Sequence, residues 1–220
     1  LSLTFLFLFS GSVYGDDLKD GLDAYERKDY KKTVRLILPL AEQGYAIAQG
    51  TLGYMYYAGL GVPQDYKEAV KWWKLAAEQG DAGAQYVMGE MYTNGQGVPQ
   101  DYKKAVKWYR LAAEKGNDRA QYNLGSIYYE GLEVPQDYKE AVKWWRLSAE
   151  QGDALAQYEL CAMYSKGQGV PKDYVLAHMW ANLSASNGYK NAIVVRDSLE
   201  KQMSPQQIVE AQRLVRNWKP

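Results

Sequence analysis

The chain has 220 residues with 26 basic and 26 acidic side chains, so its formal net charge is zero. A neutral chain lacks the basic excess that non-specific nucleic-acid binding requires, and we therefore expect no nucleic-acid partner. One cysteine, Cys161, excludes an intrachain disulfide, and one histidine, His178, excludes the common Cys/His zinc sites. We accordingly predict no metal and no cofactor.

The chain begins with LSLTFLFLFSGSVYGDD, a short apolar run followed by small and then acidic residues. The apolar run is too short to span a bilayer as a helix, and it is typical of the core of a secretory signal peptide. We predict a signal peptide over residues 1–15, truncated at its start, and a mature chain without a transmembrane segment. A buried apolar strand or helix is the alternative. The prediction places the mature chain outside the cytoplasm.

Internal repetition organises the rest of the chain. A step of 36 residues relates the Ala-Gln pairs at 48, 84, 120 and 156, and it also relates Trp72, Trp108, Trp144 and Trp180. The repetition predicts four units, over 45–80, 81–116, 117–152 and 153–188. A degenerate capping unit precedes them over 16–44, and capping helices follow over 189–220.

Each unit is predicted to contain two helices. The first carries Ala48, Leu52 and Tyr56 on one stripe, with Gly53 beside them where a missing side chain lets a neighbouring helix approach. Gly59 suits the end of that helix. Asp65 suits the start of the next, and Glu68 three residues later completes an acidic capping box. The second helix buries a broad apolar face, formed by Ala69, Trp72, Trp73, Ala76 and Ala77.

One such helix pair cannot bury its own apolar face, whereas stacked pairs can. We therefore predict an all-α fold, a right-handed α/α solenoid of tandem helix-pair repeats. Two departures from the repeat carry expectations. Cys161 takes the place of Gly53 and predicts a small buried thiol. Glu133 takes the place of the loop glycine at 61, and we expect no positive φ there. Ser204 and Pro205 are expected to start a final helix.

The repeated pattern A-Q-x-x-L-G-x-x-Y-x-x-G-x-G-V-x-x-D-Y-x-x-A-x-x-W-x-x-x-A-A-x-x-G resembles the Sel-one-like repeat (SLR) family, relatives of the tetratricopeptide repeats. The resemblance covers residues 45–188 almost continuously. It implies an interaction scaffold with a concave groove lined by the first helix of each pair, and no shared chemistry. The first unit and the chain's ending also resemble the terminal caps of bacterial secreted members. With the predicted signal peptide, this resemblance implies a periplasmic or secreted bacterial protein.

Positions that vary between the units are the candidates for function, since the fixed positions hold the shape. On the first helix of each unit the variable positions form one stripe. We predict a protein or peptide partner on this stripe, and we expect the chain to be monomeric. An ordinary solvated face is the alternative for each residue taken singly. The candidate binding residues are Tyr54, Val87, Glu90, Arg119, Asn123, Ser126 and Glu159.

The second helices carry another stripe, of basic residues. It could meet an acidic polymer or an anionic membrane surface. The alternative, which we favour, is a solubilising face interleaved with Glu68, Glu78, Glu140 and Glu150. The stripe consists of Lys67, Lys71, Lys74, Lys103, Lys107, Arg110, Lys139, Lys143 and Arg146.

Few residues suggest catalysis. His178 occupies a slot that holds valine in the other units, so we expect a packed histidine. Ser198 and Lys201 match S-x-x-K, a nucleophile motif of penicillin-binding enzymes, but S-D-N and K-T-G are absent. Cysteine-rich members of the family have been described as β-lactamases, yet their paired cysteines are missing here. We predict a non-catalytic scaffold. A β-lactam or peptidoglycan hydrolase and a cell-wall or polysaccharide binder are the alternatives.

Overall fold

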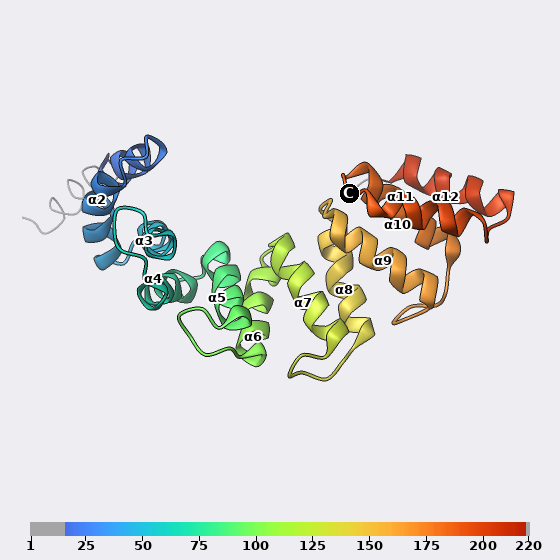
Figure 1. Ribbon diagram of the computed structural model, residues 1–220, viewed down its shortest axis with the longest axis horizontal. Coiled ribbons are helices and arrows are strands. Elements are labelled where there is room, and N and C mark those ends of the chain that lie inside the picture. Colours follow the sequence, from blue (N-terminus) through green and yellow to red (C-terminus); the bar gives the residue numbers. More distant parts are fainter. Residues whose placement is uncertain (1–15, 219–220) are drawn as a thin grey trace, which may run out of the picture. The chain divides into compact units, whose positions relative to one another are not determined.

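The structure is a computed structural model that describes residues 16–218. The predicted signal peptide over 1–15 lies outside the described residues. Residues 16–26 form a helix, and every further regular element of the described chain is also α-helical, as predicted. None of these helices is long and apolar enough to cross a bilayer. The remaining elements, labelled in Figure 1, are α2 (Tyr30–Glu42), α3 (Ala46–Ala58), α4 (Tyr66–Glu78), α5 (Ala82–Asn94), α6 (Tyr102–Glu114), α7 (Asp118–Glu130), α8 (Tyr138–Glu150), α9 (Ala154–Lys166), α10 (Tyr174–Ser186), α11 (Asn191–Glu200) and α12 (Pro205–Asn217).

The chain divides into two compact units within α6, between Trp108 and Tyr109. In the first unit α3 packs on α2 and α4, and α4 packs on α5. In the second unit α7 packs on α8, α8 on α9, and α9 on α10. We call α3, α5, α7 and α9 the A helices, and α4, α6, α8 and α10 the B helices. Tandem A–B helix pairs are therefore the building blocks of both units.

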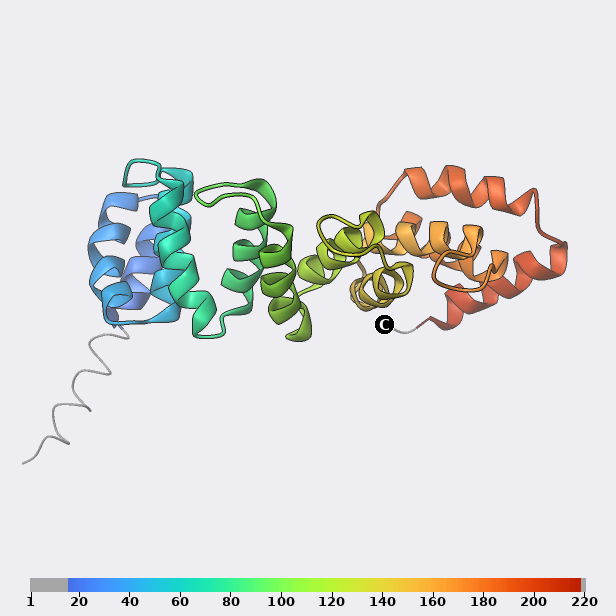
Figure 2. The same cartoon turned by 90° about the horizontal axis from the view of Figure 1, so that it is seen from below.

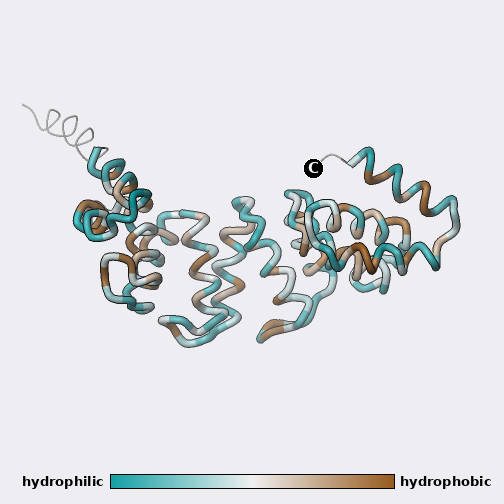
Figure 3. The backbone as a smooth tube through the Cα atoms, turned by 45° about the horizontal axis from the view of Figure 1, so that its top comes forward, coloured by the Kyte–Doolittle hydropathy of each residue, from teal (hydrophilic) through white to brown (hydrophobic). Residues whose placement is uncertain are grey.

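The predicted apolar faces are buried. In α3 the side chains of Ala48 and Leu52 are fully buried, and in α4 the whole predicted face from Ala69 to Ala77 is buried. Figure 3 shows apolar and polar positions alternating along the helices of each unit. Burial of these side chains supplies the main stabilisation, roughly 1.5–3 kcal/mol for each large apolar one.

The loop between the helices of a pair is held by its own V-P-Q-D residues. Gln64 donates from Nε2 to the carbonyl oxygen of Tyr57 at 2.8 Å, and the backbone N–H of Asp65 donates to Tyr56 at 2.9 Å. Asp65 Oδ1 then accepts from the backbone N–H groups of Lys67 and Glu68, which caps α4. Gln100 and Gln136 repeat the glutamine contact in the next two loops.

Two local predictions are wrong. Glu68 does not complete a capping box, because its carboxylate pairs with Lys71 at 3.2 Å and the Asp65 N–H is already bonded to Tyr56. Glu133 does adopt a positive φ, of 53°, like the glycines at its position in the other repeats. A left-handed conformation costs an ordinary residue about 1–2 kcal/mol. The same Gln–Asp loop contacts, from Gln136 and Asp137, hold the backbone in that shape.

Each A helix is fastened to the helix before it by the buried glutamine of its Ala-Gln pair. Gln157 donates from Nε2 to the carbonyl oxygen of Ala149 at 3.0 Å, and its Oε1 accepts from Asn187 at 3.0 Å. Gln49 and Gln121 make the same two kinds of contact. Each of these carbonyl groups lies near the end of its helix and also accepts the backbone N–H of the glycine that follows, so the glutamine is its second donor. The sequence showed that this glutamine recurs every 36 residues, but not which groups it contacts.

Two helices follow the fourth repeat. The helix α10 packs on both α11 and α12, and Figure 2 shows this pair at the C-terminal end of the second unit. The helix α12 begins as predicted, with Ser204 as N-cap, Pro205 in the first turn and a capping box completed by Gln207. Ala211 is fully buried in the core cluster of the second unit, and three partly buried side chains pack against that cluster: Ile208, Leu214 and Trp218.

Candidate functional site

Three of the predicted binding residues surround one cavity in the first unit. Tyr54 comes from α3, and Val87 and Glu90 come from α5, the next A helix. The cavity has a volume of about 220 Å³. Its remaining wall is made by Tyr57, Trp73, Met91, Asn94 and Gln96. The fold thus brings together residues that the sequence placed in two different repeats.

The cavity has aromatic walls and one carboxylate. Tyr54 is 43% exposed. Its ring lies 6.2 Å from the ring of Tyr25 in an edge-to-face arrangement. Burial and the neighbouring Tyr54 together raise the pKa of Tyr25 above its usual value. Glu90 accepts a hydrogen bond at 2.6 Å from the Tyr86 hydroxyl, which fixes the direction of its carboxylate. Such a cavity suits one side chain of a partner, with an apolar stem and a polar or cationic end.

The sequence did not identify Tyr57 and Trp73 as part of this site. Trp73 was assigned to the core, and it does lie there, with its indole N–H donated to the carbonyl of Gly50 at 3.1 Å. Its ring also contacts Tyr57, with centroids 5.5 Å apart. Tyr57 becomes threonine and serine in other repeats, at Thr93 and Ser165, so comparison of the units could have flagged that position.

The predicted residues of the second unit are less available. Asn123 donates from Nδ2 to the Tyr109 hydroxyl at 3.1 Å, and Ser126 donates to the carbonyl of Tyr122 at 3.1 Å. Both side chains therefore already make hydrogen bonds within the protein. Arg119 is exposed on α7 and has no ion-pair partner in the described part of the chain. Of these three residues, Arg119 is best placed to meet a ligand.

Glu159 on α9 is a half-buried carboxylate in the same unit. Its pKa is raised above the usual value, first because burial penalises the charged form and second because Glu130 is nearby, while Lys166 opposes the shift. Burial raises the pKa of Tyr122 above its usual value, and the nearby Glu159 carboxylate raises it further. An under-compensated carboxylate of this kind gains from a cation or a hydrogen-bond donor on a ligand.

The basic stripe of the B helices is interleaved with carboxylates, which favours the solubilising interpretation. Lys71 pairs with Glu68 at 3.2 Å, and Lys143 pairs with Glu140 at 3.1 Å. The two lysine ammonium groups also lie over indole rings, those of Trp72 and Trp144. Arg110 and Arg146 instead donate to tyrosine hydroxyl groups, those of Tyr128 and Tyr164.

His178 and Cys161 are packed, as predicted. His178 is fully buried, with Nε2 2.8 Å from Glu200 Oε1 and Nδ1 bonded to Asn182. It thereby connects α10 to α11. Cys161 is also fully buried, and burial raises the pKa of its thiol to about 12. A thiol in this state is a poor nucleophile.

The S-x-x-K match has no catalytic geometry in the structure. Ser198 lies near the end of α11, and Lys201 follows that helix. Both side chains are exposed, and no hydrogen bond joins them. Within residues 16–218 no group of three or more His, Cys, Asp or Glu side chains is placed to hold a metal ion.

The folded units define a class of protein, the α/α solenoid built from tandem helix pairs. Comparison with known families assigns it further, since the sequence profile of the Sel1 repeat matches residues 46–81, 82–117, 118–153 and 154–189. The chain belongs to the Sel1 repeat family. Repeats of this kind commonly mediate protein–protein interaction.

Solved structures agree with this assignment. A protective antigen of uropathogenic Escherichia coli strains, described as displaying an SLR fold, is 34% identical with a TM-score of 0.84, over 94% of this chain and 46% of the antigen. The chain thus spans less than half of that relative. A Sel1 repeat protein from Oxalobacter formigenes is 31% identical with a TM-score of 0.81, over 92% of this chain and 86% of its own.

A third solved structure shows the fold alone. It is a Sel1 repeat protein from Klebsiella pneumoniae, 22% identical with a TM-score of 0.52, over 85% of this chain and 93% of its own. No curated protein matches the chain.

Proposed function

We propose that the protein is a non-catalytic scaffold that binds another protein or a peptide on the exposed face of its A helices. The cavity between α3 and α5 carries the proposal. It joins the predicted residues Tyr54, Val87 and Glu90 in one pre-formed site, with a wall anchored by the Trp73–Gly50 hydrogen bond. A partner side chain that fills an aromatic-walled cavity is the usual anchor of a protein interface.

The proposal includes an extracytoplasmic location. It is supported by the apolar run and small residues over 1–15, which are typical of a signal peptide. Export of a reporter fused to the complete N-terminal segment would agree with the location, and full cytosolic retention would contradict it.

Site-specific photo-crosslinking tests the binding face. A photoreactive phenylalanine analogue is placed at Val87, inside the cavity, and separately at Leu75, an exposed leucine of α4 that is not among the cavity residues. Adducts with one defined protein from position 87, and not from 75, are expected. Equal adducts from both positions, or adducts from 75 alone, would contradict the assignment of the face.

A further inference from the structure

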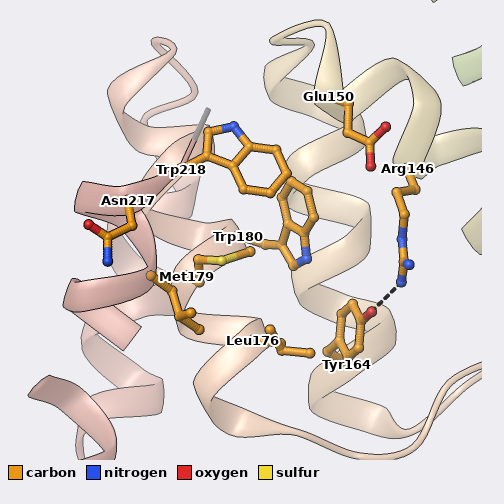
Figure 4. A pocket seen from close by; sticks show the side chains of 9 residues that line it. Arg146, Glu150, Tyr164, Leu176, Met179, Trp180, Asn217 and Trp218 are labelled. Carbon is orange, nitrogen blue, oxygen red and sulfur yellow. Dashed lines mark hydrogen bonds between the residues drawn. The ribbon is translucent and has the colours of Figure 1, made fainter. Parts of the chain in front are cut away.

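A second cavity lies in the second unit, away from the candidate A-helix residues. It has a volume of about 500 Å³ and lies between α8, α10 and α12 (Figure 4). Its apolar lining includes Leu176, Met179, Trp180 and Leu214, and the Trp218 ring meets Trp180 edge to face with centroids 5.0 Å apart. Arg146, Glu150 and Asn217 supply polar groups. A volume of this size is ordinary for a ligand pocket.

The Trp180 indole N–H makes no hydrogen bond within the described chain. In the preceding repeat Trp144, which stands at the position of Trp180, donates its N–H to Glu140 Oε2 at 3.0 Å. Leu176 occupies the position of Glu140, 36 residues later, and a leucine accepts no hydrogen bond. Trp180 is only 3% exposed, and its N–H has no acceptor within the described chain. Trp180 Nε1 is not among the fully buried polar atoms without a partner, whereas Trp72 Nε1 is, although Glu68 stands four residues before it. The Trp180 N–H is therefore accessible from the cavity and can donate to a ligand.

Glu150 provides a hydrogen-bond acceptor in the same cavity. In α4 the equivalent carboxylate, Glu78, pairs with Lys74 at 3.7 Å. Arg146 stands in the place of Lys74, but Figure 4 shows it turned toward Tyr164, to whose hydroxyl it donates. The Glu150 carboxylate therefore has no hydrogen-bond or ion-pair partner within residues 16–218. It can accept from a donor on a ligand.

These features select the chemistry of the ligand. One cation and one anion leave the polar groups of the cavity without net charge, which disfavours a strongly ionic ligand. The aliphatic wall formed by Leu176, Met179 and Leu214 disfavours a ring covered with hydroxyl groups, because those groups would be buried without partners. A peptide segment can use the donor, the acceptor and the apolar space of the cavity together. A large apolar side chain fills the cavity, a main-chain carbonyl accepts from Trp180, and a main-chain N–H donates to Glu150.

We propose that the α8–α10–α12 cavity is a second binding site, which takes a large apolar side chain of a peptide together with its flanking amides. The inference rests on the proposed function, because that function makes a peptide the expected ligand class. It uses none of the candidate A-helix residues, however. A variant with Tyr54→Ala and Glu90→Gln is therefore expected to retain this second site, and the two proposals can fail separately.

NMR of the full chain provides the test. Seven tryptophans give a small set of indole N–H signals, and Trp180→Phe identifies the signal of interest. The probes are N-acetyl-leucine amide and N-acetyl-phenylalanine amide, compared with N-acetyl-lysine amide and N-acetylglucosamine. The two apolar probes are expected to shift the Trp180 signal in a saturable way, and the lysine probe and the sugar are expected to bind at least about tenfold more weakly.

Three variants test the polar contacts of the site. Leu176→Glu restores the acceptor that Trp144 has, so it should abolish the response of Trp180 to the probes. Glu150→Gln should weaken binding about tenfold, the effect of losing one charge-assisted hydrogen bond, whereas Glu78→Gln, the matched change in α4, should leave it unaltered. A response to N-acetylglucosamine alone would make this a saccharide site. That result, no response to any probe, or equal binding by both glutamine variants would overturn the proposal.

Discussion

Gly53 and Trp73 fit against each other so closely that no side chain could stand between them. A Cβ added to Gly53 would lie 2.7 Å from Trp73 Cδ1, and the same ring donates its N–H to the carbonyl of Gly50. Gly125 and Trp145 repeat the relationship in the second unit, with a distance of 2.6 Å. The predicted close approach at the helix A glycine is thus an approach of an indole ring, and it sets one wall of the candidate binding cavity.

A pair of glycine substitutions in α3 tests this packing. Gly53→Ala should lower the free energy of unfolding by about 1–3 kcal/mol, the usual cost of overpacking. Gly50→Ala should raise it by up to about 1 kcal/mol, because nothing lies within 4 Å of the added Cβ and alanine is the better helix former. Urea unfolding followed by circular dichroism measures both. Equal effects of the two alanines would mean that the indole does not confine the glycine.

The fourth repeat accommodates a larger residue at the glycine position by a change on the facing helix. Cys161 stands where Gly53 and Gly125 stand, and Ala181 stands where Trp73 and Trp145 stand. Both are fully buried in one core cluster. The sequence showed the cysteine as a departure from the pattern. The compensating alanine is meaningful only once the glycine–indole contact of the other repeats is known.

The thiol of Cys161 should be unreactive in the folded protein. Burial raises its pKa to about 12, so the reactive thiolate is scarce at neutral and mildly alkaline pH. A disulfide reagent should label no thiol at pH 7–9 without denaturant and one thiol per chain in denaturant. Rapid labelling of the folded chain at pH 8 would show that the core of the fourth repeat is open.

Loss of a buried glutamine of the Ala-Gln pair should destabilise the fold. Gln157→Ala removes the donor to Ala149 and the acceptor for Asn187, so it should lower the free energy of unfolding by about 1–3 kcal/mol. Gln206→Ala, on an exposed face of α12, is the control and should change stability by less than about 0.5 kcal/mol. Similar losses for both would remove the glutamine from the account of how repeats are joined.

Replacing the Glu159 carboxylate should raise the stability of the fold in a pH-dependent way. Its pKa is raised in the folded chain, so the folded state binds the proton more tightly than the unfolded state does. The ionised carboxylate therefore costs stability above the raised pKa, and this cost disappears as the pH falls below the usual value of 4.5. Glu159→Gln should raise the free energy of unfolding at pH 7 but not at pH 4. The exposed Glu26→Gln should have no effect at either pH, and a gain for Glu159→Gln that is larger at pH 4 would contradict the assignment.

Much of the fold was predictable because each repeat marks its helices with caps, glycines and a 36-residue step. The conformation at Glu133 was not, since a non-glycine residue at that loop position indicates a negative φ until the surrounding loop contacts are seen. The site was predictable in part. The stripe identified Tyr54, Val87 and Glu90, whereas the loss of an acceptor for Trp180 depends on a contact between Trp144 and Glu140 that no periodicity reveals.

Binding by the A-helix face is most directly tested by the affinity of a double variant for the protein that crosslinks at position 87. Tyr54→Ala with Glu90→Gln removes an aromatic wall and the carboxylate of the cavity, and isothermal titration calorimetry compares it with wild type and with the control Leu75→Ala. We predict a loss of affinity of at least about tenfold for the double variant and none for the control. Unchanged affinity of a folded double variant would contradict the central claim.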